Sequence, residues 1–388
     1  MDIKIVFSMY MLSEEHKLTV KVIREFVDQH VRPKARSIDK GEYPRQLLKL
    51  LGELNILVPT LPPDVGGAGA DTLTQVLVVE ELAKASPGLA TIMEIQSSML
   101  AENLYHNGNK VHREEVVPKL ASGEAVGAFA LSEPCCGSDA AAIQTRAERR
   151  GGEWVINGTK MWITSGLYAD YYLVFARSGP AEARHRAITA FLLHRNSCIE
   201  ATPIEVMGVR GTGTAEVRLN DCRAGDDDVV GEVNGGWKIA MWGINMGRLN
   251  VGAIGLGIAE EALREAYIYA QRRIAFGKAI SEFQIIQHYL AEMYARTEAL
   301  RSVVYTAAKM RDAGDSDFPL YAQVAKLLGS RTAVDVVRLA LQIQGGYGYS
   351  TDSPLEMLYR DAKVTEIYEG TNEIILNTIY KFMREKFA

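Results

Sequence analysis

WVINGTKMWI, residues 154–163, is the segment that decides the fold class. Two apolar runs of strand-forming residues flank an Asn157-Gly158 pair, which is the strongest short-range signal for a β-hairpin. Further runs of strand length follow, separated by turn residues: YYLVFAR, AITAFLL and AEVRL. These segments predict a small, hairpin-rich β domain rather than a parallel sheet built from β-α-β units.

Helical patterns lie on both sides of this β segment. Ser13, followed by two glutamates, is typical of a helix N-terminus. Three long helical patterns follow the Gly235-Gly236 pair. We therefore expect a mainly α protein with a middle β domain. The predicted parts are an N-terminal helical domain over 1–128, a β domain over 129–235 and a C-terminal helical domain over 236–388.

The composition excludes several classes of function. The 388 residues include 43 Lys and Arg against 48 Asp and Glu, a net charge of −5, so the basic surface that nucleic-acid binding requires is missing. The longest stretch without a charged residue, 339–351, is shorter than the roughly 18 residues that a membrane span needs. Four cysteines without a CxxC motif make a poor disulfide framework. We expect a soluble, cytoplasmic protein of a reducing compartment, with neither nucleic acid nor membrane as partner.

The common catalytic motifs are also missing. The sequence has no GxGxxG after a strand and no GxxxxGK[ST], which argues against a dinucleotide-binding unit and a phosphate-binding loop. It has no HExxH, no Cys/His cluster and no GxSxG. Common nicotinamide enzymes, hydrolases and zinc sites are therefore unexpected, and we predict no metal.

Six compact, polar, glycine-containing segments remain, and each taken alone reads as a turn or a helix cap. They are ALSEPCCGSD (130–139), NGTKMWITSG (157–166), MGVRGTGT (207–214), RRIAFGKAISEFQ (272–284), QIQGGYGYSTDSP (342–354) and RDAKVTEIYEGTNEI (360–374). In this order and spacing they closely resemble the acyl-CoA dehydrogenase family of flavoproteins, over essentially the whole chain. The resemblance implies a β-barrel-like middle domain and a C-terminal four-helix bundle.

The resemblance also implies a reaction and its base. A carboxylate removes the α-proton of an acyl thioester while the β-hydrogen leaves as a hydride to FAD. Glu369, in IYEGT, matches that base, although a Glu there could merely favour a helix N-terminus through the dipole. Some members carry the base on the first bundle helix, but here Gly247 precedes Arg248. We therefore expect Glu369 to stand alone, with its pKa raised by burial.

Cofactor-binding residues follow from the same resemblance. Ser132, Trp162 and Thr164 match positions that cover and hydrogen-bond the flavin, and the alternative for Trp162 is a core position of the β domain. Arg273 of a neighbouring subunit would pair with the FAD pyrophosphate, because guanidinium binds phosphate oxygens in a fork. FAD binding then requires a homo-oligomer, at least a dimer and usually a tetramer. The other matches are Phe276, Gln284, Gln342, Gly345 and Gly346 across the interface, and Thr371 and Glu373 after the base.

Substrate contacts are implied at four further positions, and chain length is left open. Ser138 matches a residue near the CoA portion, and the other three lie around the base: Arg248, Tyr368 and Gly370. Residues 92–100, IMEIQSSML, would line the acyl pocket, but their mixed character does not decide the acyl group. The Cys135-Cys136 pair replaces a usual Gly-Ala and is interpreted as two small residues in a tight loop rather than a redox pair.

The predicted function is FAD-dependent dehydrogenation of an acyl-CoA to a trans-2-enoyl-CoA in fatty-acid β-oxidation. Electrons would pass to an electron-transferring flavoprotein. One alternative acts on an acyl group bound to a carrier protein, with the same motifs. Another is a flavin monooxygenase or oxidase of the same fold, against which Glu369 argues. A third is a non-catalytic relative, against which the intact motifs argue.

Overall fold

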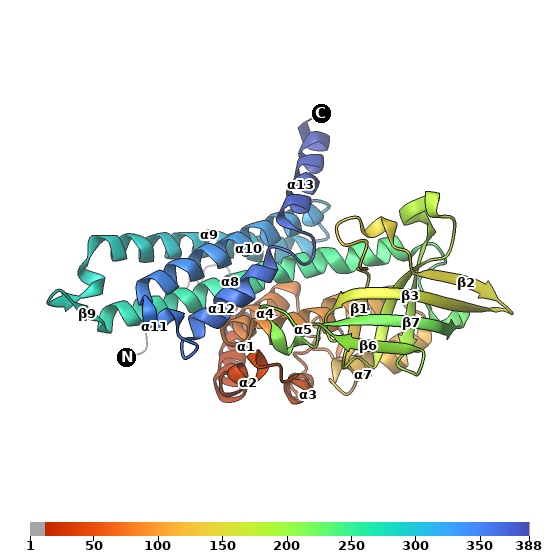
Figure 1. Ribbon diagram of the computed structural model, residues 1–388, viewed down its shortest axis with the longest axis horizontal. Coiled ribbons are helices and arrows are strands. Elements are labelled where there is room, and N and C mark those ends of the chain that lie inside the picture. Colours follow the sequence, from red (N-terminus) through yellow and green to blue (C-terminus); the bar gives the residue numbers. More distant parts are fainter. Residues whose placement is uncertain (1–11, 388) are drawn as a thin grey trace.

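The computed structural model describes residues 12–387 and arranges them as helices, a sheet and a long helical bundle in chain order (Figure 1). The first eleven residues of the predicted N-terminal domain, and residue 388, lie outside the described residues. The predicted order of helices, middle β domain and helices is confirmed.

The first helix begins where the sequence predicts. Ser13 accepts a hydrogen bond from the His16 N–H, and the His16 ring accepts one from the Ser13 N–H, so that each satisfies a free donor of the other. Helix α4 is buried along its whole length and packs against bundle helices α8 and α9. The N-terminal helices are α1 (Glu14–Phe26), α2 (Ala35–Asp39), α3 (Arg45–Glu53), α4 (Thr72–Ala85), α5 (Pro87–Glu94), α6 (Glu102–Asn107) and α7 (Val117–Ala121), with the π-helical segment η5 (Ile95–Ala101) after α5.

The middle domain is a single eight-stranded sheet with strand order β6-β7-β3-β2-β4-β5-β8, and β1 pairs in parallel with β4. Most other pairs are antiparallel, as expected for a hairpin-rich sheet. The strands are β1 (Gly127–Ala130), β2 (Arg146–Arg150), β3 (Glu153–Ile163), β4 (Tyr171–Arg177), β5 (Ile188–His194), β6 (Ile199–Pro203), β7 (Ala215–Ala224) and β8 (Val229–Val230).

The hairpin predicted at Asn157-Gly158 is wrong, because β3 runs straight through this pair. The Asn157 side chain is instead paired with β7: its Nδ2 donates to Asp221 Oδ1 over 2.9 Å, and its Oδ1 accepts the Asp221 N–H over 2.8 Å. The pair lies at an irregularity in the β3–β7 register. The turn into β3 is made earlier, at Gly151 and Gly152, which have φ angles of 62° and 93°.

The cysteines differ from the expectation of a reduced chain with no disulfide framework. Cys198, just before β6, is bridged to Cys222 of β7, with their Cα atoms 5.3 Å apart. The two positions are brought together because β6 and β7 are neighbours, and the Asn220 N–H donates to the Cys198 oxygen. Cys135 and Cys136 are also joined to each other. A spacing of 24 residues carries no local signal for such a pair.

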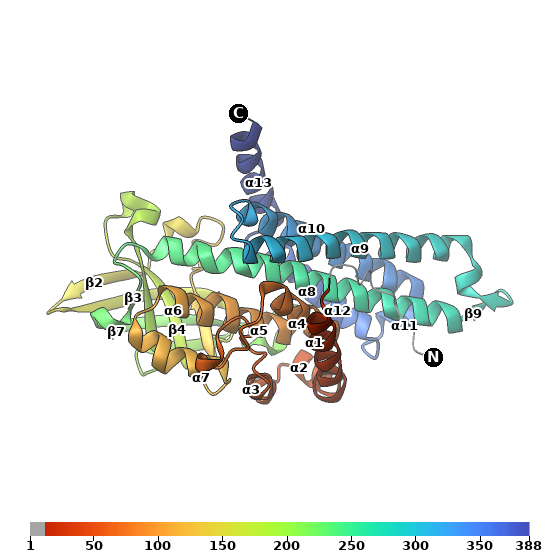
Figure 2. The ribbon, with the colours of Figure 1, turned by 180° about the vertical axis from the view of Figure 1, so that it is seen from behind.

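Three long helices form the core of the C-terminal bundle. Helices α8 and α10 approach closely, since a Cβ atom at Gly255 would lie 2.4 Å from the main-chain oxygen of Gly329. A small hairpin joins α8 to α9 at the end farthest from the sheet, and α13 projects from the body (Figures 1 and 2). The elements are α8 (Gly236–Arg272), β9 (Ile274–Ala275), β10 (Lys278–Ala279), α9 (Gln284–Asp312), α10 (Phe318–Gln344), α11 (Gly346–Tyr349), α12 (Pro354–Thr365) and α13 (Asn372–Phe387). Within residues 12–387, no helix combines the length and apolar character needed to cross a bilayer.

Candidate active site

Glu369 lies in the turn between α12 and α13, at the middle of the bundle. Its φ angle is 53° and that of Gly370 is 98°, so two successive residues adopt left-handed backbone. Such a conformation is costly for a side chain like Glu and persists where the surroundings impose it, often at functional sites. The Glu369 N–H donates to no described residue, so the turn presents both a carboxylate and an unused donor.

Two cationic side chains fix this turn from two different helices. Arg248 of α8 donates from Nε to the Glu369 main-chain oxygen over 3.0 Å. Lys326 of α10 donates from Nζ to the Gly370 oxygen over 2.6 Å and to Asn372 Oδ1 over 2.9 Å. Lys326 is missing from the sequence predictions, because it resembles any other lysine in an amphipathic helix. Only the packing of α10 against the turn reveals its position.

The electrostatics of the turn suit a base at neutral pH. Burial raises the pKa of Glu369 to about 7, as expected from the sequence, while the positive charges of Arg248 and Lys326 act to lower that pKa. Burial lowers the pKa of Lys326 to about 8. A carboxylate with a pKa near the working pH can both accept a proton and release it again.

A second carboxylate corrects the expectation that Glu369 stands alone. Glu94, the last residue of α5, lies over Gly247 of α8. A Cβ atom at Gly247 would lie 2.6 Å from Glu94 Oε1 and 3.0 Å from Glu369 Oε2, so both carboxyl groups face the same point. Burial, and then the negative charge of Glu369, raise the pKa of Glu94 well above its usual range. The absent side chain of Gly247 leaves room for this pair.

The structure brings Ser132, in the loop after β1, close to the end of β3, where Trp162 and Thr164 lie. Ser132 and Thr164 are half-buried, and neither hydroxyl makes a hydrogen bond to a described residue. The Met161 N–H donates to the Ser132 oxygen over 2.9 Å, which connects the loop after β1 to β3. Trp162 is 61% exposed with a φ angle of 62°, so the alternative of a core position is wrong. An exposed indole held in left-handed backbone is a ready face for a flat ligand.

A buried ion pair holds the loop that carries Ser132. Lys160 of β3 is fully buried and donates to Glu133 Oε1 over 2.8 Å and to the Leu131 oxygen over 3.1 Å. Glu133 in turn accepts the Gln144 and Thr145 N–H groups. Burial lowers the pKa of Lys160 to about 8, while the charge of Glu133 opposes this shift. The loop is therefore fixed before any ligand arrives.

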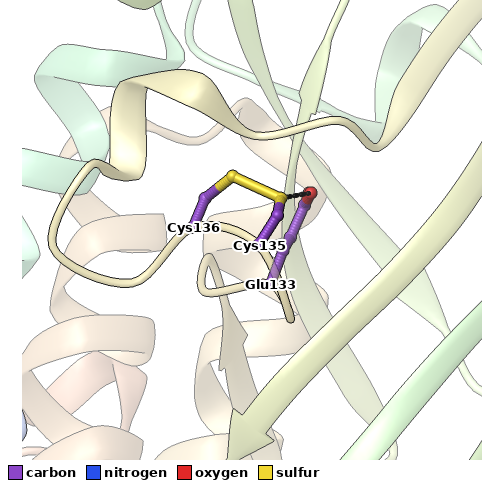
Figure 3. A group of neighbouring side chains, drawn as sticks. All are labelled: Glu133, Cys135 and Cys136. Carbon is purple, nitrogen blue, oxygen red and sulfur yellow. Dashed lines mark hydrogen bonds between the residues drawn. A yellow bond between two sulfur atoms is a disulfide. The ribbon is translucent and has the colours of Figure 1, made fainter.

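Glu133, Cys135 and Cys136 gather at the turn of this loop (Figure 3). Their potential ligand atoms lie within 4.8 Å of one another, a spacing compatible with a metal ion. Glu133 already accepts hydrogen bonds at both oxygens, and the two sulfur atoms are bonded to each other. The cluster is therefore a structural part of the loop in this state.

The flavin residues predicted to act across a subunit interface lie at the opposite end of the molecule from the sheet. Phe276, in the β9–β10 hairpin, is 95% exposed, and the Arg273 guanidinium lies 5.7 Å above the Tyr347 ring. A Cβ atom at Gly345 or Gly346 would contact nothing, so this backbone is open to a ligand. Strand β3, which carries Trp162, and the β9–β10 hairpin lie at opposite ends of the chain (Figure 1). Within one chain, these residues therefore do not meet the group formed by Ser132, Trp162 and Thr164. The residues predicted to act across the interface are Arg273, Phe276, Gln284, Gln342, Gly345 and Gly346, of which all but the two glycines carry exposed side chains.

The predicted residues around the base have different surroundings. Tyr368 directly precedes Glu369, and burial raises the pKa of its hydroxyl. Thr371 accepts the Ile374 N–H at the start of α13, and Glu373 is exposed in its first turn. Ser138 is exposed in the loop after β1.

Family models match three consecutive parts of the chain. They are described as the N-terminal domain (residues 13–124), the middle domain (128–222) and the C-terminal domain (234–384) of acyl-CoA dehydrogenase. An acyl-CoA dehydrogenase of Bacillus subtilis is 37% identical over 375 residues, covering 96% of this chain and 98% of that protein. The human mitochondrial short-chain specific acyl-CoA dehydrogenase is 37% identical over 366 residues, covering 94% and 88%. The acryloyl-CoA reductase (NADH) of Anaerotignum propionicum is 38% identical over 370 residues, covering 94% and 93%.

Solved structures of similar proteins match the fold of this chain over nearly its whole length. Butyryl-CoA dehydrogenase from Megasphaera elsdenii has a TM-score of 0.93 at 35% identity, covering 96% of this chain and 98% of that one. A chain from work on the electron transferring flavoprotein of Acidaminococcus fermentans has a TM-score of 0.93 at 35% identity, covering 99% of both. A glutaryl-CoA dehydrogenase of Mycobacterium smegmatis in complex with FADH2 has a TM-score of 0.93 at 27% identity, covering 99% and 98%. This chain belongs to the acyl-CoA dehydrogenase family of oxidoreductases.

Proposed function

We propose that this protein is an FAD-dependent acyl-CoA dehydrogenase in which Glu369 removes the α-proton of an acyl-CoA. The observation that carries the proposal is the strained turn of Glu369, with a pKa of about 7 and fixed by Arg248 and Lys326. An α-proton is a poor acid, so negative charge that develops on the thioester oxygen must be stabilised. The Glu369 N–H, which donates to no described residue, would serve as the protein donor to that oxygen.

The residues of the β domain fit a flavin. Trp162 offers an exposed aromatic face, and Ser132 and Thr164 offer hydroxyls that no described residue uses. When bound, FAD would accept the β-hydrogen as a hydride at N5, which leaves a trans-2-enoyl-CoA. Trp162 would cover the ring and exclude water, while the hydroxyls would orient its polar edge. The Lys160–Glu133 pair supports this role by fixing the loop in advance.

A homo-oligomer, at least a dimer and in the usual family state a tetramer, would complete the cofactor site. The Arg273 guanidinium and the open backbone at Gly345 and Gly346 suit a phosphate group, but they lie far from Trp162 in the same chain. A second copy of the chain would bring the residues around its own Arg273 to the β-domain residues Trp162, Ser132 and Thr164 of the first copy. The exposed Phe276 beside Arg273 supports burial against another surface.

An electron-transferring flavoprotein is the proposed electron acceptor, and a solved relative comes from work on such a protein. The reverse reaction is a second candidate, because a relative of 38% identity is an acryloyl-CoA reductase that uses NADH. The same residues serve both directions, since Glu369 would then return a proton to the α-carbon. Measuring enoyl-CoA reduction against acyl-CoA oxidation distinguishes the two.

Anaerobic titration of the purified protein with a panel of acyl-CoAs tests the proposal. Loss of the visible flavin absorbance with one class of acyl-CoA would establish the dehydrogenase half-reaction. Bleaching by the matching acyl carrier protein thioester alone would favour the carrier-protein alternative. A flavin-containing protein that no thioester reduces would favour a monooxygenase or oxidase. A colourless protein that binds no FAD would be a non-catalytic relative.

A further inference from the structure

Glu94 carries a buried carboxyl group that has no partner. The residue is 1% exposed, and its Oε1 accepts no hydrogen bond. Arg248 and Lys326 offset the charge of Glu369, but among residues 12–387 the charge that acts on Glu94 is that of Glu369, which has the same sign. Burial and the charge of Glu369 keep Glu94 protonated in the absence of a ligand, and a ligand that supplies the missing cation would let its carboxylate form and pair with that cation.

The position of Glu94 places that missing group in the substrate site. Its Oε1 and the Oε2 of Glu369 both lie within 3.0 Å of the point where a Gly247 Cβ would be. On the proposed function, Glu369 must reach the α-carbon of the acyl group. A carboxyl group that faces the same point therefore faces the acyl chain.

The surroundings of Glu94 contain several buried polar atoms without a hydrogen-bond partner among the described residues, including the hydroxyl group of Tyr368. Ser98, one turn further along, accepts a hydrogen bond from Asn250 Nδ2 over 2.9 Å and another from Gln75 Nε2. The amide oxygens of Gln75 and Asn250 are themselves buried with no donor. Three side-chain acceptors, those of Glu94, Gln75 and Asn250, thus lack a donor among the described residues. A plain alkyl chain can satisfy none of them, whereas a group rich in N–H donors can.

We propose that Glu94 forms an acyl-chain subsite for a protonated amino substituent. The preferred substrate is then an acyl thioester that carries an amine, rather than a plain alkyl or dicarboxylic acyl group. The inference rests on the proposed function and names its substrate class. An ammonium group would donate to Glu94 and separate two like charges. A terminal carboxylate would instead add a negative charge beside Glu369 and would supply no cation to Glu94.

Calorimetric binding of three CoA thioesters to the Glu369→Gln holoenzyme tests the proposal, because this variant cannot consume them. The probes are 4-(dimethylamino)butyryl-CoA, 5-methylhexanoyl-CoA and glutaryl-CoA, which share chain length and a branched end but differ in charge. The amino thioester is expected to bind about tenfold or more tightly than its alkyl counterpart, in keeping with a charged hydrogen bond, and glutaryl-CoA should bind most weakly. Equal affinity for the amino and alkyl thioesters would overturn the proposal, as would tightest binding of glutaryl-CoA.

Second substitutions in the same background identify the responsible residue. Glu94→Gln keeps the shape and removes the charge, so the preference for the amine should fall about tenfold, and Glu94→Leu should reverse it. Glu102→Gln is the matched control. Glu102, at the start of α6, is also buried, but its Oε1 accepts a hydrogen bond from the Thr60 hydroxyl over 2.7 Å. This control should leave the order of affinities unchanged. If the Glu94→Leu variant still bound the amino thioester more tightly than the alkyl thioester, the proposal that Glu94 forms the subsite would be wrong.

The failure of this proposal is distinguishable from that of the proposed function. The enzyme with Glu369 intact tests the function through anaerobic bleaching of its flavin by 5-methylhexanoyl-CoA or butyryl-CoA. Bleaching without any preference for the amine would remove the Glu94 subsite alone. Absence of bleaching by any thioester would remove the dehydrogenase function, whatever the order of affinities.

Discussion

Arg248 donates a hydrogen bond from its Nε to the main-chain oxygen of Glu369 over 3.0 Å. The contact joins the middle of α8, the longest helix, to the turn between α12 and α13. Lys326 fastens the same turn from α10. The backbone of the candidate base is thus fixed by the bundle rather than by its own helix, and its carboxyl group feels the charges of both cations. The same two cations therefore act on both the position and the pKa of Glu369.

The rate of flavin reduction by an acyl-CoA is expected to rise with pH and level off above about 7. Glu369 accepts a proton only when ionised, and burial raises its pKa to about 7. Below that pH the rate should fall about tenfold per unit, as the carboxylate becomes protonated. Glu369→Gln should lower the rate by about 10²–10⁴-fold above pH 7 and abolish this pH dependence. Anaerobic stopped-flow mixing measures both, and a rate independent of pH from about 5 to 9 would rule out Glu369 as the base.

Lys326→Met should move this pH profile to higher pH by roughly one unit. The positive charge of Lys326 acts to lower the pKa of Glu369, so its removal stabilises the protonated acid. The variant should be slower than the parent near pH 7 and approach it near pH 9. Lys326→Arg keeps the charge and is the control, with a profile close to that of the parent. An equal loss of rate at all pH values would show that Lys326 acts only by holding the Gly370 oxygen.

Gly247→Ala should slow flavin reduction by about tenfold or more while the protein remains folded. The new Cβ would lie 2.6 Å from Glu94 Oε1 and 3.0 Å from Glu369 Oε2, so a carboxyl group must move. Both atoms are the ends of flexible side chains, so the shift should cost little in the free energy of unfolding and act mainly on the placement of the two carboxyl groups. Adding Glu94→Ala makes room and should restore much of the rate, which a double-mutant cycle measures. Additive losses would mean that the two carboxyl groups do not share this space.

Sequence reasoning singled out Glu369 as the candidate base but did not single out two charged residues that surround it in the structure. Glu369 is recognisable because its motif is contiguous, and the turn is made by adjacent residues. Glu94 lies in the segment 92–100 that is expected to line the acyl pocket, but its approach to Glu369, like that of Lys326, depends on the packing of α5 and α10 against α8, which a local pattern does not contain. The Asn157-Gly158 pair misled for a related reason. Its local turn preference was outweighed by pairing with Asp221 on β7, which a local pattern does not contain.

Lys160→Met should destabilise the protein and weaken FAD binding. Lys160 is fully buried against Glu133, and removing one partner of a buried pair leaves an unpaired charge, at a cost of about 3–5 kcal/mol in the free energy of unfolding. The loop with Ser132 would lose its support as well. Thermal unfolding and an FAD titration measure the two effects. The double variant Lys160→Met, Glu133→Gln removes both charges and should recover part of the stability. No recovery would mean that the pair acts through packing.

Mixing of two inactive variants tests whether the cofactor site is shared between chains. Arg273→Gln and Trp162→Ala alter groups at opposite ends of one chain, and each homo-oligomer should lose FAD affinity. In a mixed dimer, one site would receive both altered residues and the other would receive neither. Co-expression with two different tags and tandem purification should therefore recover about half of the parent's FAD per chain, with normal affinity at those sites. Mixed oligomers that bind no more FAD than either parent variant would place both residues at one site within a single chain, or outside the cofactor site.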